Sequence, residues 1–361
     1  MTRIFKILIP SIILSTVCCK KTESVAETKI TTPAKDTLSK IDDSKGYPIN
    51  FDTTKVIENV FVTARSGIEM KQEKDVNSKT LGNYEYGVML EVIEDTGEWL
   101  GVRDRITRTY IENDKTIESN GWEKVYVQKK ATGKIGQLSL LPSDLNVVSF
   151  LTIHGKSQEV GKDQRLDDFI KIELIDKQLF DSKKSTAINY LVTDTTAIIK
   201  RNGLIELKTP GKTKTFKDNP TDEDDRQIYS YLGQFPVLNQ YLVQGNYYEG
   251  SDFQFIDKST GANTQTFGDI PYLSPDKKHI ISIYGNPYEQ TSDLALYTVN
   301  NNKIKEVMSA SFKNWMPAIE PGEMFWSKDG YLYLNANHVK AYWQENGHLN
   351  SQFQYIRIKV L

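Results

Sequence analysis

The stretch that decides the fold is residues 86–102, which read YGVMLEVIEDTGEWLGV. Apolar and other residues alternate over Met89–Ile93 and again over Trp99–Arg103, which is the pattern of half-buried β-strands. Gly97 and the polar residues before it indicate a tight turn between the two. Further short stretches of this kind, separated by glycine and Asp/Asn turns, follow one another from Val60 onward. Five or six such strands predict a small β-barrel.

The order of these stretches resembles the bacterial SH3 (SH3b) family, over about residues 58–142. The stretches that carry the resemblance are Gly67–Lys71, Ser78–Gly82, Gly87–Val92, Gly97–Val102 and Thr132–Ile135. The sequence departs from the family where Glu69-Met70-Lys71 replaces Asn-Val-Arg and where Lys134 replaces the closing Trp. A long insertion, residues 104–120, stands where the family has a short turn. We therefore predict an SH3b-like barrel over residues 56–145.

Members of the SH3b family often bind cell-wall peptides or glycan, so the resemblance implies a ligand surface on this module. Aromatic side chains are the candidates, because a partly exposed ring can stack on a sugar or fill a pocket of a partner. An aromatic residue in a strand can equally pack in the core. Both interpretations apply to the ligand-binding candidates Trp99, Tyr84, Tyr86, Trp122 and Tyr126.

The N-terminus predicts export. Arg3 and Lys6 precede an apolar run, residues 7–17, which is too short to span a bilayer and is typical of a signal peptide. The following Cys18-Cys19 resembles the lipobox of bacterial lipoproteins, with Cys19 as the lipidated residue after a signal peptide over residues 1–18. Cleavage before Cys18 would fit less well, because it puts a valine in the position that prefers a small residue.

The lipoprotein resemblance implies a multiply acylated cysteine, which holds a protein on a membrane far more durably than a single chain does. Lys20 after the acylated residue implies the outer membrane, facing the periplasm or the surface. Residues 19–50, rich in Lys, Thr, Ser and acidic residues without strand or helix period, predict a flexible tether. The expected location is therefore the cell envelope.

The cysteine count and the net charge exclude several classes of functional site. The only two cysteines are Cys18 and Cys19, so the body of the protein can hold no disulfide, cysteine nucleophile or thiolate zinc site. A formal net charge of −2 does not indicate nucleic-acid binding, because such binding requires a strongly basic surface.

Residues 146–361 predict a second all-β domain. Strand-like stretches recur at 241–256, 279–297 and 331–358, a spacing near that of propeller blades. Tyr272–Lys278 and Phe325–Gly330 between them resemble propeller turns, which favours a small β-propeller-like domain; a β-sandwich is the alternative. Residues 164–179 fit a helix, although Phe169–Leu174 also reads as a strand.

The sequence contains no recognisable set of catalytic residues. The four histidines lack the spacing of a zinc helix, and no nucleophile elbow is present. The acidic run Asp222–Asp225 lacks the features of a calcium loop and indicates a solvated loop. Carboxylates of the second domain such as Glu320 and Glu323 could form a pair for glycan cleavage. We predict no metal and no cofactor. We expect an envelope binding or scaffolding protein that recognises cell-wall peptide or a protein partner, with a glycan hydrolase or lyase as the alternative.

Overall fold

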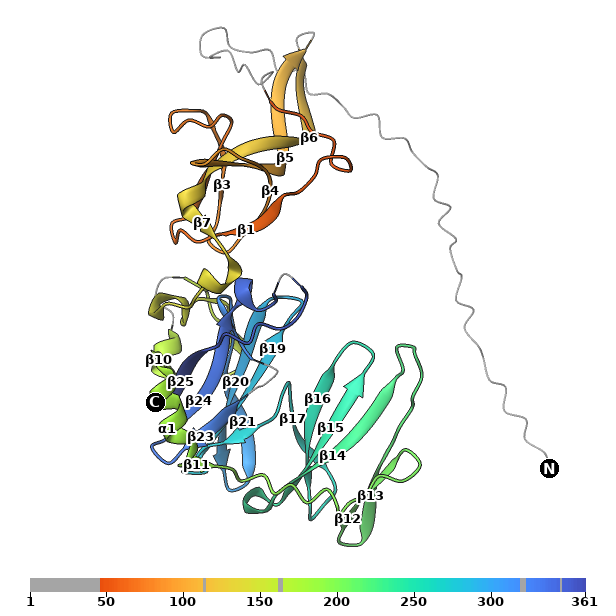
Figure 1. The fold of residues 1–361 in the computed structure, drawn as a ribbon. Coiled ribbons are helices and arrows are strands. Elements are labelled where there is room, and N and C mark those ends of the chain that lie inside the picture. The colour runs from red at the N-terminus through yellow and green to blue at the C-terminus, as the bar shows by residue number, and fades with distance from the viewer. Residues whose placement is uncertain (1–45, 113–114, 162–164, 319–322, 345) are drawn as a thin grey trace, which may run out of the picture. The chain divides into compact units, whose positions relative to one another are not determined.

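A computed structural model describes residues 46–112, 115–161, 165–318, 323–344 and 346–361 (Figure 1). Strands dominate these residues, and their one α-helix is the short α1, Lys177–Lys184. The predicted all-β class is confirmed. The 3₁₀ turns are Lys129–Ala131, Ile135–Gln137, Pro142–Asp144, Arg165–Asp168, Pro236–Leu238 and Val339–Ala341. No helix in the described part of the chain is long and apolar enough to cross a membrane.

The first part of the chain forms one seven-stranded sheet in the order β3-β2-β6-β5-β4-β1-β7. Its strands are β1 (Glu58–Val62), β2 (Ile68–Lys71), β3 (Thr80–Tyr84), β4 (Met89–Asp95), β5 (Trp99–Glu112), β6 (Lys115–Gln128) and β7 (Thr132–Gly133). The alternating residues named above supply its core, since Val92 and Val102 are paired neighbours that are fully buried. Val62, Val125 and Val127 are fully buried as well. We call this sheet the N-terminal module.

The inserted residues 104–120 extend two strands instead of forming a loop. They are the outer arms of β5 and β6, each 14 residues long. The outer part of this hairpin, Arg105–Gly121, belongs to a unit separate from the one that residues 47–104 and 122–361 form together.

The rest of the chain forms four antiparallel sheets. The largest two have six strands each, in the orders β18-β19-β20-β21-β8-β9 and β10-β25-β24-β23-β11, with β22 paired to β24. A four-stranded sheet follows the order β14-β15-β16-β17, and β12 pairs with β13. The strands are β8 (Val148–Ile153), β9 (Lys156–Ser157), β10 (Ile170–Ile175), β11 (Ala187–Ile188), β12 (Leu204–Thr209), β13 (Lys212–Lys217), β14 (Gln227–Phe235), β15 (Gln240–Tyr247), β16 (Ser251–Asp257), β17 (Asn263–Phe267), β18 (Tyr272–Leu273), β19 (His279–Asn286), β20 (Thr291–Asn300), β21 (Lys303–Phe312), β22 (Trp315–Pro317), β23 (Met324–Ser327), β24 (Tyr331–His338) and β25 (Gln354–Val360).

The recurring stretches of the sequence are the central strands of these sheets. Each of β15–β16, β19–β20 and β24–β25 is an antiparallel pair within its own sheet. The β19–β20 and β24–β25 sheets share the largest apolar core, in which Trp315 and Trp326 are buried. The β15–β16 sheet joins the β19–β20 sheet through a second core that contains Phe255, Phe267 and Tyr297. The description of this region as propeller-like or as a sandwich stays an interpretation.

Of the two interpretations of residues 164–179, the strand over Phe169–Leu174 is confirmed and the helix over the whole stretch is wrong. Ile170–Ile175 forms β10, which pairs with β25 at the C-terminal end of the chain. The helix α1 begins only after Asp176, whose Oδ1 accepts a hydrogen bond of 2.7 Å from the Leu179 backbone N–H. This N-cap fixes the start of the helix, and the pairing with β25 outweighs the local helical pattern of the preceding residues.

Candidate functional site

The five predicted binding aromatics lie in different surroundings on the N-terminal module. Tyr84 and Tyr126 are buried, at 9% and 4% exposure. The Tyr84 hydroxyl donates a 2.5 Å hydrogen bond to Asp104, and burial together with this bond raises the pKa of Tyr84. Trp99, Tyr86 and Trp122 are each half-buried. The binding role of all five residues stays a prediction, but only half-buried rings leave surface for a ligand.

Trp99 begins β5 and points away from the core. The next residue, Leu100, is buried at 1% exposure, and Val102 is fully buried. Side chains alternate along a strand, so Trp99 shares the outer surface of β5 with Arg103. Arg103, on this side of β5, borders an aromatic surface whose centre is formed by other residues.

That centre lies where residues 47–51 contact β6. The Trp122 carbonyl accepts a 2.9 Å hydrogen bond from Ile49 N–H, and the Tyr47 carbonyl accepts one of 2.8 Å from Lys124 N–H. The ring of Phe51 packs on the ring of Trp122, with 4.4 Å between centroids. Tyr47 meets Tyr126 edge to face at 6.2 Å. We call Tyr47, Phe51, Trp122 and Tyr126 the aromatic face.

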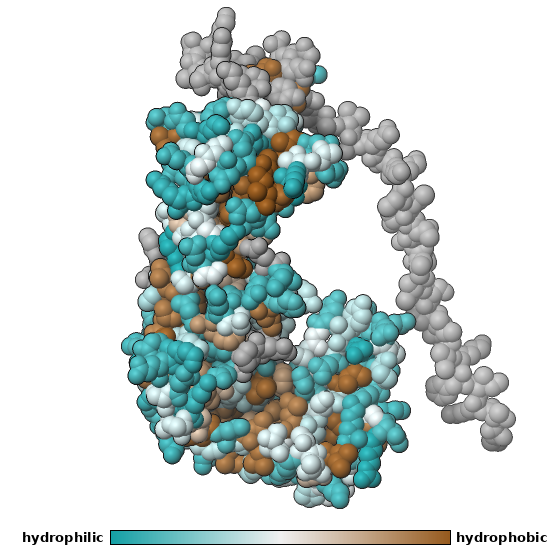
Figure 2. Space-filling view, in the orientation of Figure 1, coloured by the Kyte–Doolittle hydropathy of each residue, from teal (hydrophilic) through white to brown (hydrophobic). Residues whose placement is uncertain are grey.

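Part of the aromatic face is open to solvent. Tyr47 is 38% exposed and Phe51 is 39% exposed. Apolar residues interrupt an otherwise mostly hydrophilic surface on the N-terminal module (Figure 2). Two aromatic rings that remain more than one third exposed after packing on their neighbours can still contribute contact area to a partner.

Cations border the aromatic face, and carboxylates neutralise them. The Arg103 guanidinium lies 4.0 Å from the centroid of Phe51 and donates a 2.9 Å hydrogen bond to Glu91. Lys124 contacts the rings of Tyr47 and Tyr126 and forms an ion pair with Glu94. The pKa of Glu91 and that of Glu94 are both lowered, chiefly by the hydrogen bonds from these two cations. The surface is therefore aromatic with balanced charge.

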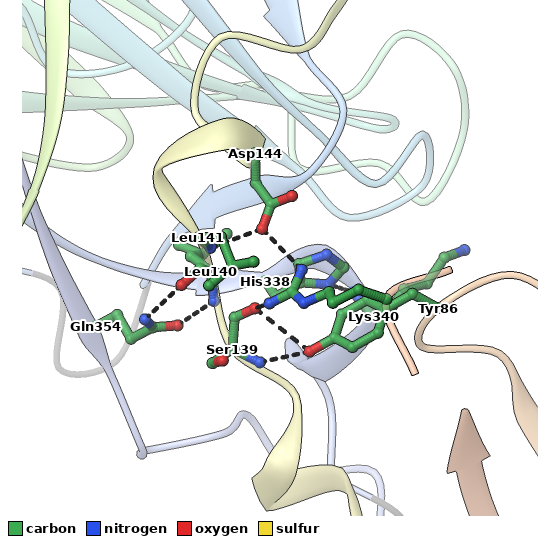
Figure 3. A network of polar contacts seen from close by, with 9 residues as sticks. Tyr86, Ser139, Leu140, Leu141, Asp144, His338, Lys340 and Gln354 are labelled. Atoms are coloured by element: carbon green, nitrogen blue, oxygen red, sulfur yellow. Dashed lines mark hydrogen bonds and ion pairs between the residues drawn. The ribbon is translucent and has the colours of Figure 1, made fainter. Parts of the chain in front are cut away.

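Tyr86 lies in a different place, at the contact between the N-terminal module and the later sheets (Figure 3). The Tyr86 hydroxyl accepts a 2.8 Å hydrogen bond from Ser139 N–H. The Arg65 guanidinium covers the Tyr86 ring at 3.8 Å and donates a 2.9 Å hydrogen bond to Asp144. The His338 ring, at the end of β24, packs edge to face on the Tyr86 ring, with 5.2 Å between the ring centroids. We call Arg65, Tyr86, Asp144 and His338 the junction network.

The junction network is backed by apolar packing and by main-chain bonds. Phe61 of β1 shares a small core with Leu138 and Ala341. Gln354 donates a 3.1 Å hydrogen bond to the Leu140 carbonyl (Figure 3). Tyr86 is therefore occupied by contacts inside the protein, and its sequence position alone could not distinguish this role from ligand binding.

Burial lowers the pKa of His338 to about 4, helped by the nearby cations Arg65 and Lys340 and opposed by Asp144. The His338 Nδ1 accepts a 3.2 Å hydrogen bond from Lys340 N–H. An imidazole with this pKa is neutral at pH 7, so it serves here as a packed acceptor and not as a cation.

Only one of the two carboxylates named for glycan cleavage lies within the described residues. Glu320 lies outside the described residues, and Glu323 forms an ion pair of 2.6 Å with Lys184. Asp225 of the acidic run accepts hydrogen bonds from Thr221 and Asn219, as a self-contained loop does. Within the described ranges no group of three or more His, Cys, Asp or Glu residues could hold a metal ion.

One carboxyl group that sequence reasoning missed is Asp269, between β17 and β18. It is half-buried, and burial raises its pKa to about 6, opposed by a hydrogen bond from Ile270 N–H. A carboxyl whose pKa is raised by burial gains from any cation that comes to lie beside it. Nothing in the local sequence distinguishes Asp269 from a surface aspartate.

Comparisons with family models, with curated proteins and with solved structures found no match to this chain.

Proposed function

We propose that this protein is a lipid-anchored component of the bacterial cell envelope that binds a cell-wall peptide or a protein partner through the aromatic face. The observation that supports this most is the partial exposure of Tyr47 and Phe51, at 38% and 39%, on the module whose sequence resembles SH3b domains. The cations beside these rings are already paired with carboxylates. The aromatic face therefore favours an uncharged or weakly charged surface of a partner.

The main-chain contacts at the aromatic face also support a peptide ligand. Residues 47–49 run antiparallel to β6 and exchange two backbone hydrogen bonds with Trp122 and Lys124. An extended segment that adds to a strand while its side chains meet aromatic rings is one of the recurring modes of peptide recognition. The module therefore has the chemistry to hold an extended peptide beside the segment that it already holds.

Attachment to the membrane rests on the sequence. The signal peptide, Cys19 and most of the tether lie outside the described residues. The last residues of the predicted tether include 47–49, which pair with β6, so a lipid on Cys19 would keep the aromatic face within reach of the envelope. The hydrolase alternative stays a prediction, and the ion pair between Glu323 and Lys184 gives it no support.

Cosedimentation with purified peptidoglycan sacculi tests the proposal, with the full chain kept in a neutral detergent. We expect saturable binding that the double variant Phe51→Ala, Trp122→Ala lowers by about tenfold or more, as for loss of central aromatic contacts. Ile199→Ala, which removes an apolar side chain that is 59% exposed elsewhere, is the matched control.

If sacculi bind neither the native chain nor the variants, the same detergent-solubilised chain is crosslinked to an envelope extract. A partner protein lost with the double variant alone would support the protein-partner form of the proposal. Equal recovery by the native chain and the double variant in both assays would reject the aromatic face as the binding surface.

A further inference from the structure

Two hairpins of successive sheets carry the same residue at four of five tip positions. Residues 245–249 read Gly-Asn-Tyr-Tyr-Glu, and residues 285–289, located 40 positions later, read Gly-Asn-Pro-Tyr-Glu. The first stretch forms the turn from β15 to β16, and the second forms the turn from β19 to β20. The pattern of buried and exposed residues is identical over 241–250 and 281–290. In repeat proteins, loops that recur at one position of each unit frequently make up the binding face.

The repeated tyrosines contribute little to the fold. Tyr248 is 54% exposed and Tyr288 is 88% exposed, so folding leaves more than half of each residue in water. The turns themselves are built by other groups: Asn286 Oδ1 accepts hydrogen bonds of 3.1 Å from the backbone N–H groups of Tyr288 and Glu289. Single exposed aromatic residues are common. The informative observation is that an exposed tyrosine occupies the same position in both hairpin tips.

The two tips project from the same side of their sheets. Phe267 pairs with Phe253 close to the first tip. Gly268, the next residue, lies so that an added Cβ would be 3.7 Å from the Cβ of Tyr284, close to the second tip. Asp269 N–H then donates a 3.0 Å hydrogen bond to the Ser282 hydroxyl. The chain thus crosses directly from one tip region to the other, and both hairpins point the same way in Figure 1.

The charges at the tips have one sign. Residues 244–252 and 284–293 contain Glu249, Asp252, Glu289 and Asp293, and no Lys or Arg, although the whole chain has 45 of these cations. Glu249 and Glu289 are exposed and form no ion pair within the part of the chain that the structure describes. The faces of tyrosine rings are also negative, so rings and carboxylates attract the same kind of group. A cationic group is therefore attracted by both the tyrosine rings and the carboxylates.

Asp269 adds a fifth carboxyl, on the segment that links the two tip regions. Its carboxylate accepts a hydrogen bond from Ile270 N–H, and no ion pair reaches it within the described residues. Burial raises its pKa to about 6, which means that a cation brought next to Asp269 would relieve the cost of its charge. The electrostatic environment between the tips therefore favours the same ligand class as the tips themselves.

We propose that the β15–β16 and β19–β20 tips together form a docking surface for a basic segment of another polypeptide, whose Lys or Arg side chains contact Tyr248, Glu249, Tyr288 and Glu289. Two equivalent tips fit a partner with at least two cations in succession, because each tip offers one ring and one free carboxylate. This surface lies on other sheets than the aromatic face and does not depend on the function proposed for that face.

The test is a titration of the full chain, in a neutral detergent, against a fluorescent ten-residue oligolysine, followed by anisotropy at low and at physiological salt. We expect saturable binding that weakens with salt, because exposed charge pairs are screened. Glu249→Gln with Glu289→Gln, and separately Tyr248→Ala with Tyr288→Ala, should each weaken binding by about tenfold, as the loss of two surface ion pairs or cation–π contacts implies. Glu206→Gln with Glu306→Gln removes the same charge from exposed positions elsewhere and should leave the affinity unchanged.

Three results would overturn the proposal. The first is no saturable binding of oligolysine by the native chain. The second is an equal loss of affinity in the Glu206, Glu306 control, which would reduce the effect to overall charge. The third is binding of a neutral glycan such as a chitin hexasaccharide that requires the tyrosines but not the glutamates, which would make the surface a glycan site. Circular dichroism of each variant checks that its fold is retained.

Discussion

Replacing His338 by Asn should change how the stability of the protein depends on pH. Asn can retain an acceptor for Lys340 N–H but removes the group that titrates. The folded pKa of His338 is about 4 and its ordinary value is 6.5. Because the folded pKa is depressed, the unfolded chain binds this proton first as the pH falls. The native protein therefore loses stability from about pH 6.5 toward pH 4 through His338.

The magnitude follows from the two pKa values. A difference of 2.5 units at 1.36 kcal/mol per unit makes the His338 contribution about 3 kcal/mol between pH 7 and pH 4. His338 is only 6% exposed, so solvent screening reduces this little. This loss of stability would arise in the junction network, because protonated His338 would face the cation of Arg65.

Asp269 acts in the opposite direction over the same range. Its folded pKa is about 6, above its ordinary 3.8, so its contribution to stability is full below pH 3.8 and is lost as the pH rises through 6. This contribution is also about 3 kcal/mol. The two residues offset each other in the native protein, whereas the His338→Asn variant retains the Asp269 contribution without the opposing one.

Urea unfolding of both proteins between pH 4 and pH 7 measures the difference. The free energy of unfolding of His338→Asn, relative to that of the native protein, should rise by about 3 kcal/mol from pH 7 to pH 4. Parallel pH profiles of the two proteins would refute the reasoning, since they would mean that His338 has the same pKa in the folded and unfolded states.

Three further changes have defined outcomes. Gly87→Ala should destabilise the protein by about 1–3 kcal/mol in urea unfolding, because Gly87 has φ +80° and an added Cβ would lie 2.6 Å from the Cβ of Lys340; an unchanged midpoint would contradict this. Trp315→Phe should cost about 2–3 kcal/mol in thermal or urea unfolding, because Trp315 is fully buried and its indole N–H donates a 3.1 Å hydrogen bond to the Leu145 carbonyl; a loss below 0.5 kcal/mol would count against that packing. Cys19→Ala should move the protein from the membrane to the soluble fraction of cells, and continued membrane fractionation would reject the lipoprotein prediction.

Much of the fold could be predicted because it rests on local alternation. Leu100 and Val102 point inward, as the alternation in residues 99–103 predicts, and the strand-like stretches near 241, 279 and 331 are central strands. The helix bounds failed because β10 pairs with β25, whose residues are nearly 200 positions away. Strand pairing at such a separation leaves no signal in a short window of sequence.

The surroundings of the aromatic candidates could not be predicted for a related reason. Whether a ring is exposed depends on what the rest of the chain places on it. Tyr86 is covered by Arg65 and approached by His338, and Trp122 is partly covered by Phe51. The repeated hairpin tips, in contrast, were readable as a sequence repeat, but their exposure and common direction required the structure.

The proposed function is tested most directly by a photocrosslinking amino acid placed at Asp52, the exposed neighbour of Phe51, in the full chain and activated in living cells. We predict adducts to a second molecule, either a cell-wall peptide or one envelope protein, which are absent when the crosslinker replaces Ile199. No adduct at position 52, or the same adducts from both positions, would contradict the assignment of the aromatic face as the binding surface.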